Sequence, residues 1–290
     1  MKAPAFLYRR PETLEEALHL LSKNSGDAQI LAGGQSLMPT LNMRLSAPGM
    51  LVDINRIAAL RPLTERGDKI HLGALVRHCE VLESAVVAAK VPLLAKAMTH
   101  VAHMAVRNRG TTCGSLALAD PSAEAPAVAV LLDATIHLQS IGGVRDVPAR
   151  EFFQGLYVTD RRDDEMIIGA SFPCVQQGEV FRFAELSRRH GDFAIVGIAA
   201  KGRYRQGAIS DLEVVVFGSE PSPLLSAVSE TMMIAPDTKD GTLRDLAQAI
   251  AESMDPIDNH QGRPDTKRRQ AAEMLGRCFV ELRGSLHVRP

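Results

Sequence analysis

Apolar residues near the start of the chain recur every three or four positions, and this spacing predicts a helix. The helix is expected to begin after Thr13, because Thr13 and Glu16 form the T-x-x-E pattern of a capping box. Gly26 is the expected end of the segment. The apolar face of this helix is expected to consist of Leu14, Ala17, Leu18 and Leu21.

Short apolar runs that end at turn residues predict strands, and longer runs with helical spacing predict helices. Strands are expected at 28–32, 50–54, 69–73, 135–140, 144–147 and 165–172. Helices are expected at 77–90, at 92–105 and from Asp120 and Pro121 to about residue 133. Residues 107–115 are rich in polar and turn-forming residues, and we expect them to form a loop.

The pattern changes after residues 174–178. Long β-rich runs follow at 194–204 and 208–217, and helical patterns close the chain at 243–254 and 265–286. Strands followed by helices indicate an α+β domain. We therefore expect two domains, at 1–175 and 179–288, with the first divided into subdomains of about 1–56 and 57–175.

Composition narrows the class of protein. The chain has 290 residues, of which 46% are hydrophobic and 23% charged, which is typical of a globular protein. Lys and Arg (33) balance Asp and Glu (34), so a nucleic-acid partner is not expected. No apolar run reaches the ~18 residues of a membrane span, and no signal-peptide pattern is present, so we expect a cytoplasmic protein. The four cysteines are too scattered to predict a metal site or a disulfide scaffold; they are Cys79, Cys113, Cys174 and Cys278.

Two glycine-containing loops are candidates for ligand binding. In the first, Gly33 and Gly34 follow a predicted strand and precede Gln35, Ser36 and a helix-like start. Such a turn exposes several backbone N–H groups, to which a phosphate can bind. The loop matches neither the Walker pattern nor G-x-G-x-x-G, and a simple tight turn is the alternative interpretation.

The second loop, 109–115, also combines glycines with hydroxyl residues. Two such loops in one domain favour a large anionic ligand such as a dinucleotide, because a pyrophosphate needs donors from more than one side. Arg107 and Arg109 are either phosphate contacts or part of a solvated or subunit-facing surface.

Several segments of the chain together resemble one family, the FAD-binding (medium) subunits of the molybdenum hydroxylases, which include carbon monoxide dehydrogenase and xanthine dehydrogenase. The resemblance covers nearly the whole chain, in order and at the right spacing. The matching segments are 32–39 (AGGQSLMP), 52–57 (VDINRI), 107–115 (RNRGTTCGS), 119–124 (ADPSAE), 188–194 (RRHGDFA) and 267–269 (KRR).

The resemblance implies an α+β fold, in which an FAD-binding domain of the vanillyl-alcohol-oxidase (PCMH) type precedes a smaller domain of the CO dehydrogenase flavoprotein C-terminal type. It places the loop from residue 32 and residues 111–115 around the pyrophosphate, Val101 near the adenine, Glu124 as a polar contact and Ile168 at the isoalloxazine edge. It implies no catalytic acid or base and no metal ligand. The implied cofactor-binding residues are Ala32, Gly33, Gly34, Gln35, Ser36, Leu37, Val101, Thr111, Thr112, Cys113, Gly114, Ser115, Glu124 and Ile168.

The resemblance also implies partners and an electron-transfer role. A large subunit would hold the molybdopterin cofactor, a small subunit would hold [2Fe–2S] clusters, and the assembly would be a dimer of heterotrimers. FAD on this chain would relay electrons from the clusters to an external acceptor. The alternatives are a stand-alone flavin reductase of the same fold, or a structural subunit that has lost FAD.

Four further positions carry open expectations. Cys113 stands where the family has glycine, and FAD binding is expected to survive if Cys113 avoids the left-handed conformation; an inert thiol is favoured over a reactive one. His100 and His103 are three residues apart on a predicted helix, where packing or surface exposure is favoured over metal binding. His190, between the domains, lies either near the flavin or on the surface.

Overall fold

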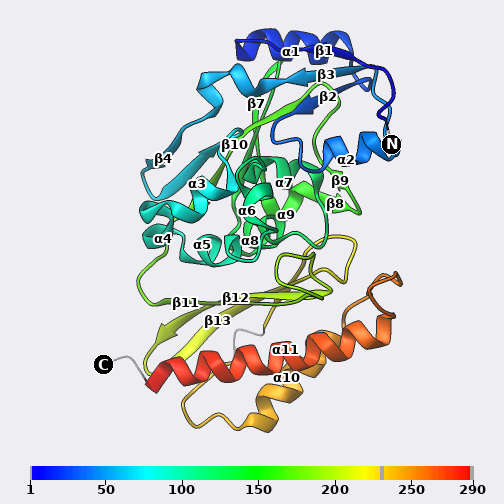
Figure 1. The fold of residues 1–290 in the computed structure, drawn as a ribbon. Helices are drawn as coiled ribbons and strands as arrows, with labels where there is room; N and C mark the ends of the chain where they lie inside the picture. The colour runs from blue at the N-terminus through cyan, green and yellow to red at the C-terminus, as the bar shows by residue number, and fades with distance from the viewer. Residues whose placement is uncertain (1, 229–231, 288–290) are drawn as a thin grey trace.

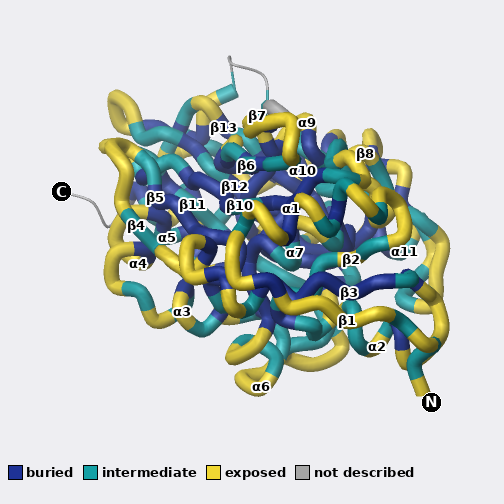
Figure 2. The backbone as a smooth tube through the Cα atoms, turned by 90° about the horizontal axis from the view of Figure 1, so that it is seen from above, coloured by how far each residue is buried: buried dark blue, intermediate teal, exposed yellow. Residues whose placement is uncertain are grey.

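The computed structural model describes residues 2–228 and 232–287, so the expected domain ends at residues 1 and 288 lie outside the described residues. The chain begins with a small parallel sheet, whose central strand β3 is buried along its length (Figure 2). Helix α1 (Leu14–Lys23) packs on it through the predicted apolar face, and the Thr13 hydroxyl accepts a hydrogen bond from the Glu16 N–H at 3.2 Å, as the capping pattern predicts. The strands, in sheet order, are β1 (Leu7–Arg9), β3 (Met50–Asp53) and β2 (Ala28–Leu31).

A five-stranded antiparallel sheet forms the centre of the N-terminal half. The predicted strands at 69–73, 135–140, 144–147 and 165–172 are all present in it, with end shifts of about one residue. In sheet order the strands are β4 (Leu63–Arg66), β5 (Lys69–Gly73), β10 (Met166–Pro173), β6 (Thr135–Ser140) and β7 (Gly143–Pro148).

Short helices and turns connect the strands of both sheets, and most of the helices lie between the central sheet and the C-terminal half (Figure 1). The helices are α2 (Leu37–Asn42), α3 (His78–Glu83), α4 (Ala85–Lys90), α5 (Pro92–Met98), α6 (Met104–Arg107), α7 (Thr112–Leu118), α8 (Glu124–Leu132) and α9 (Ala149–Phe152). Two 3-10 turns, η1 (Ile54–Arg56) and η2 (Ala58–Leu60), and a two-stranded hairpin, β8 (Phe153–Gly155) and β9 (Val158–Thr159), complete this half.

The C-terminal half is one antiparallel sheet with two long helices on its far face (Figure 1). Its helices extend over Asp240–Glu252 (α10) and Pro264–Gly284 (α11), close to the predicted ranges, and η3 (Ser285–His287) follows. Among the described residues, no helix is both long and apolar enough to cross a bilayer. The strands, in sheet order, are β11 (Glu179–Leu186), β12 (Val196–Arg205), β13 (Ala208–Phe217) and β14 (Leu224–Ala227).

Both faces of this C-terminal sheet are buried. Along β12 and β13, alternate side chains such as Ile198 and Val214 pack with α10 and α11, whereas Ala199 and Val215 belong to the core of the N-terminal half. Helix α8 contacts β12 and β13 and is buried at every residue. A helix that is apolar all round must be covered on all sides, and here the C-terminal sheet, the helices α5, α7 and α9 and strand β10 of the central sheet cover it. The two halves therefore share one continuous core.

Two expected helices are interrupted in the structure. The prediction over 77–90 was wrong as one helix, because Ser84 between α3 and α4 is extended (φ −74°, ψ 111°) and its hydroxyl accepts a hydrogen bond from the Val87 N–H. The prediction over 92–105 was wrong beyond Met98. Ala102 lies in the left-handed region (φ 42°), which ends the helical path before α6.

The boundaries around 107–124 also differ from the sequence pattern. Residues 107–115 are not one loop, because α7 begins at residue 112 after Thr111, which serves as its N-cap. Asp120 does not start the next helix. Its carboxylate accepts a hydrogen bond from the Ser122 N–H at 2.9 Å and forms a turn, and α8 begins at Glu124. Side-chain hydrogen bonds of this kind compete with helix formation, which periodicity alone does not reveal.

Candidate functional site

The two glycine loops are in direct contact. The first follows β2, and Gly34 takes a positive φ (70°), which a side chain would disfavour. Gly33 is buried against the second loop: a Cβ added there would lie 2.8 Å from the Gly110 Cα and still closer to the Arg109 carbonyl oxygen. The absence of a side chain at Gly33 therefore permits this close approach, which joins the two predicted ligand-binding segments into one site.

Two polar side chains, Asn55 and Arg77, connect the two loops. The Asn55 amide donates a hydrogen bond to the Ala32 carbonyl at 2.8 Å. The Arg77 guanidinium donates to the Asn55 Oδ1 at 2.6 Å and also to the Arg109 carbonyl. Asn55 lies in a matching motif but had no assigned role, and Arg77 was not identified from the sequence. Both link segments that are distant in the chain, so the local pattern gives no signal for them.

Asp53 holds Asn55 in place through hydrogen bonds. Its carboxylate accepts hydrogen bonds from the Tyr8 hydroxyl and from the Asn55 N–H, the latter at 2.9 Å. Burial disfavours the ionised carboxylate, but the hydrogen bonds from Tyr8 and Asn55 outweigh it and hold the pKa of Asp53 below its usual range. The first loop therefore rests on an ionised, hydrogen-bonded support.

The two loops differ in the donors that they can offer. Among the described residues, the backbone N–H groups of residues 33–36 donate no hydrogen bond. In the second loop, the N–H of Thr112 donates to the Val76 carbonyl, and those of Gly114 and Ser115 donate to Thr111. The first loop can thus offer free N–H donors to an anion. In the second loop most of these N–H groups are already used in hydrogen bonds within the protein.

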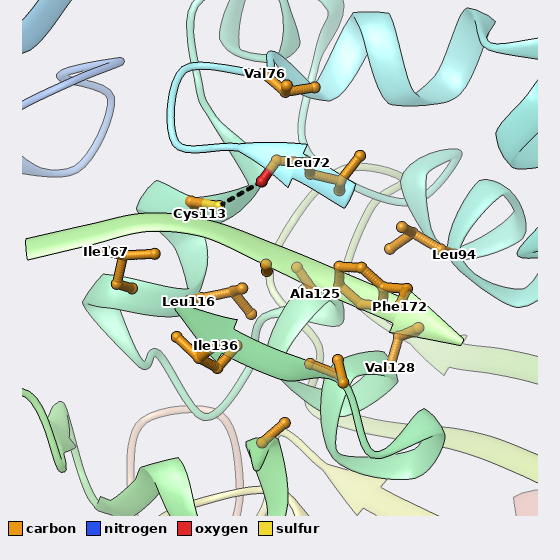
Figure 3. Packing of buried hydrophobic residues seen from close by; sticks show 14 of the residues in the cluster. Leu72, Val76, Leu94, Cys113, Leu116, Ala125, Val128, Ile136, Ile167 and Phe172 are labelled. Atoms are coloured by element: carbon orange, nitrogen blue, oxygen red, sulfur yellow. Dashed lines mark hydrogen bonds between the residues drawn. The ribbon is translucent and has the colours of Figure 1, made fainter. Parts of the chain in front are cut away.

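Cys113 lies in helix α7 and is not among the described residues with positive φ. Its side chain points into the apolar core, where Leu72 and Leu116 also lie, and Sγ is 3.8 Å from the Leu72 carbonyl oxygen (Figure 3). Burial raises the pKa of the Cys113 thiol to about 12, so the thiol is not activated at neutral pH. The cysteine therefore brings no left-handed strain and no reactive group to the site.

The remaining expected contacts lie on three separate elements. Val101 is buried in the turn after α5, and its carbonyl accepts a hydrogen bond from Arg107 at 2.7 Å. Arg107 is thus a structural support of this turn. Glu124 opens α8 and is buried, which raises the pKa of its carboxyl to about 7. Ile168 lies where the register of β10 shifts, and its carbonyl accepts from the Ala74 N–H.

A second polar group, which the sequence analysis did not assign to the site, lies where the two halves of the chain meet. Glu185 lies one residue before the end of β11, its side chain is only 2% exposed, and its Oε2 lies 3.8 Å from the His100 Nδ1. His100 is not on a helix, and its ring stacks against His190 at a centroid distance of 6.0 Å. No group of three or more metal-ligating side chains occurs within 2–228 and 232–287.

Known proteins match the chain along nearly its whole length. A family model described as "FAD binding domain in molybdopterin dehydrogenase" matches residues 4–175, and one described as "CO dehydrogenase flavoprotein C-terminal domain" matches residues 181–282. The chain is 36% identical over 282 residues to the 6-hydroxypseudooxynicotine dehydrogenase complex subunit alpha of Paenarthrobacter nicotinovorans, covering 97% of this chain and 95% of that protein.

Two further similarities agree with these matches. The chain is 32% identical to the carbon monoxide dehydrogenase medium chain of Hydrogenophaga pseudoflava, covering 96% of this chain and 97% of that one. The structure of quinoline 2-oxidoreductase from Pseudomonas putida 86 superposes with a TM-score of 0.93 at 33% identity, over 99% of both chains. The expected fold class, with an FAD-binding domain before a CO dehydrogenase flavoprotein C-terminal domain, is confirmed. The chain belongs to the FAD-binding medium subunits of the carbon monoxide dehydrogenase type of molybdenum hydroxylases.

Proposed function

We propose that this chain takes electrons from [2Fe–2S] clusters of a small subunit and passes them through FAD to an external acceptor. FAD, when bound, supplies a carrier that exchanges electrons singly or in pairs. The chain itself would hold and orient that carrier. The observation that carries the proposal is the contact of the two glycine loops, where the N–H groups of residues 33–36 have no partner within the described part of the chain.

Residues 33–36 would bind the pyrophosphate through their backbone N–H groups, with Ala32 and Leu37 at the two ends of the loop. The pair of Asn55 and Arg77 would hold this loop against residues 111–115, which would close the opposite side of the site. A preformed cradle of this kind suits a charged ligand, because it loses little conformational entropy on binding.

The other three positions would contact the rest of the cofactor. Val101 would pack near the adenine, Glu124 would accept a hydrogen bond from the cofactor, and a main-chain group of Ile168 would meet the isoalloxazine edge. The burial of Val101 and Glu124 supports these roles, because a buried apolar wall and a buried acceptor suit an aromatic base and a hydroxyl group.

The proposed assembly contains a large molybdopterin subunit that oxidises the substrate, a small iron–sulfur subunit and this chain, in a dimer of heterotrimers in the cytoplasm. Within the chain, we propose that residues 1–175 form the FAD domain, with subdomains of about 1–56 and 57–175, and that residues 179–288 form the C-terminal domain. The similar proteins support the assembly, since one is named as a subunit of a dehydrogenase complex and the other as a medium chain. Four free cysteines are in keeping with a reducing compartment.

The test is an absorption spectrum of the purified chain supplied with FAD, followed by mass identification of the released cofactor. A stoichiometric amount of FAD, together with co-purification of a large and a small subunit, is the expected result. FAD without partners, together with reduction by a nicotinamide, would indicate a stand-alone flavin reductase. Absence of FAD from both the folded chain and the assembled complex would indicate a structural subunit and would overturn the proposal.

A further inference from the structure

The turn that contains Val101 is held from both halves of the chain. On the N-terminal side, Arg107 donates hydrogen bonds to the carbonyls of Val101 and Ala102 at 2.7 Å. On the C-terminal side, the loop after β11 packs directly on the turn: a Cβ added at Gly191 would lie 2.8 Å from the Ala102 carbonyl oxygen. The position of this turn therefore depends on how the C-terminal half is seated.

Glu185 is the buried polar group at this contact. Its Oε2 is buried and has no hydrogen-bond partner among the described residues, although the Nδ1 of His100, next to Val101, lies 3.8 Å away. The His100 ring lies against two rings of the C-terminal half, with centroid distances of 5.0 Å to Phe183 and 6.0 Å to His190. A charged carboxylate in such a place would be costly, because no donor compensates its lost hydration.

Burial and a nearby charge both favour the protonated form of Glu185. Burial, and then the nearby Glu124 carboxylate, raise the pKa of Glu185 to about 8. Burial, with Lys96 and His190 adding to it, lowers the pKa of His100, so the ring is neutral. The buried and unpartnered Glu185 therefore keeps its proton to a higher pH than Glu124 does.

We propose that Glu185 is a positioning residue for the cofactor: in its neutral form it seats the C-terminal half against His100, beside the turn that carries Val101. This inference rests on the proposed function, because Val101 and Glu124 are its proposed FAD contacts. A protonated Glu185 can donate its hydrogen to the His100 Nδ1 after a small side-chain movement. An ionised Glu185 would instead repel both Glu124 and the anionic cofactor.

The consequence is a loss of FAD affinity at alkaline pH. If FAD binds only the form with protonated Glu185, the contribution of Glu185 to the Kd is constant below its pKa of about 8 and raises the Kd about tenfold for each pH unit above it. From pH 7 to pH 9 the Kd of the wild-type chain should therefore increase by about tenfold.

The experiment is a titration of the cofactor-free full chain with FAD, followed by flavin fluorescence, at intervals from pH 6.5 to pH 9. Glu185→Gln keeps the size and the neutral state, and its Kd should stay flat from pH 7.5 to pH 9. Glu179→Gln is the matched control, because Glu179 lies on the same strand but pairs with Arg203; it should behave as wild type. A flat wild-type profile, or an unchanged rise in Glu185→Gln, would overturn the inference.

Infrared spectroscopy of the wild-type chain, with and without labelled glutamate, provides a test that needs no variant. A band from a protonated glutamic acid should be present at pH 7.5 and be lost as the pH passes above about 8, and its absence at pH 7.5 would also overturn the inference. The two proposals fail differently. If the chain binds no FAD at any pH, the proposed function and this inference both fail, whereas FAD binding that does not depend on pH overturns the inference alone.

Discussion

The contact between the two glycine loops can be tested by one added methyl group. In Gly33→Ala, the new Cβ would lie 2.8 Å from the Gly110 Cα and closer still to the Arg109 carbonyl oxygen, which are both main-chain atoms. Main-chain atoms cannot rotate away as the end of a flexible side chain can. The loops must therefore separate, and the N–H groups of residues 33–36 would move relative to residues 111–115.

The expected size of the effect follows from the cost of overpacking. Forcing an extra methyl group into a close-packed region costs about 1–3 kcal/mol. If FAD must hold both loops at their native separation, this cost appears in binding, and about 1.4 kcal/mol corresponds to a tenfold change. The Kd for FAD should therefore rise by about 5-fold to 150-fold. The unfolding temperature of the cofactor-free chain should change less than that of the FAD-bound chain.

The assay is an FAD titration by fluorescence, combined with thermal unfolding of both forms. Gly241→Ala is the matched control, since no atom lies within 4 Å of a Cβ added at Gly241 in helix α10. Alanine within a helix should stabilise the chain by up to about 1 kcal/mol without changing the Kd. Wild-type affinity in Gly33→Ala would refute the reasoning, because it would mean that the contact between the loops does not shape the cofactor site.

Three other substitutions test separate parts of the site. Asn55→Ala removes the amide that holds the Ala32 carbonyl, so it should destabilise the chain by about 1 kcal/mol in urea unfolding and weaken FAD binding several-fold. Cys113→Ala should lose about 1 kcal/mol of stability but keep its FAD, and the wild-type Cys113 should react with thiol reagents only after unfolding, as peptide mapping would show. Glu124→Gln should flatten the pH dependence of the free energy of unfolding. In the folded chain Glu124 keeps its proton up to a pKa of about 7, whereas in the unfolded chain it loses the proton near pH 4.5. The stability of the wild-type chain should therefore fall as the pH rises from about 5 to about 7. A Glu124→Gln variant whose stability follows the wild-type pH profile would contradict that assignment.

The parts of the fold that could be predicted are those that short-range pattern determines. The hairpin of β6 and β7 and the pair of β12 and β13 were predicted almost to the residue, because an apolar run, a turn and a second run lie next to one another in the sequence. Helix α1 was predicted through its cap and its apolar face. In each case the signal and the structure share the same few residues.

The helices that were predicted wrongly share one cause, a side chain or a tertiary contact that overrides helical spacing. Ser84 starts a new helix although the apolar spacing continues through it. Ala102 takes a left-handed conformation, with the Arg107 guanidinium holding its carbonyl. Asp120 bonds to the Ser122 N–H and delays α8 until Glu124. A window of hydrophobicity does not include the hydrogen bonds that decide these positions.

The residues of the site also differ in whether the local sequence could reveal them. Gly33 and Gly34 were recognisable, because a glycine pair after a strand has a direct physical meaning for the main chain. Arg77 was not recognisable, since its role depends on reaching Asn55 and the Arg109 carbonyl, which come from other parts of the chain. An arginine at the start of a helix has no local feature that distinguishes it from a solvated one.

Glu185 shows why burial must be known before a charge can be interpreted. In the sequence it stands among alternating polar and apolar residues, where no strand was predicted, and it resembles an ordinary surface glutamate. Its burial arises because both faces of the C-terminal sheet are covered, one by α10 and α11 and the other by the core around α8. The shared core thus buries Glu185, near the end of β11, beside His100. The same packing that stabilises the two halves against each other would therefore give the cofactor site its sensitivity to pH.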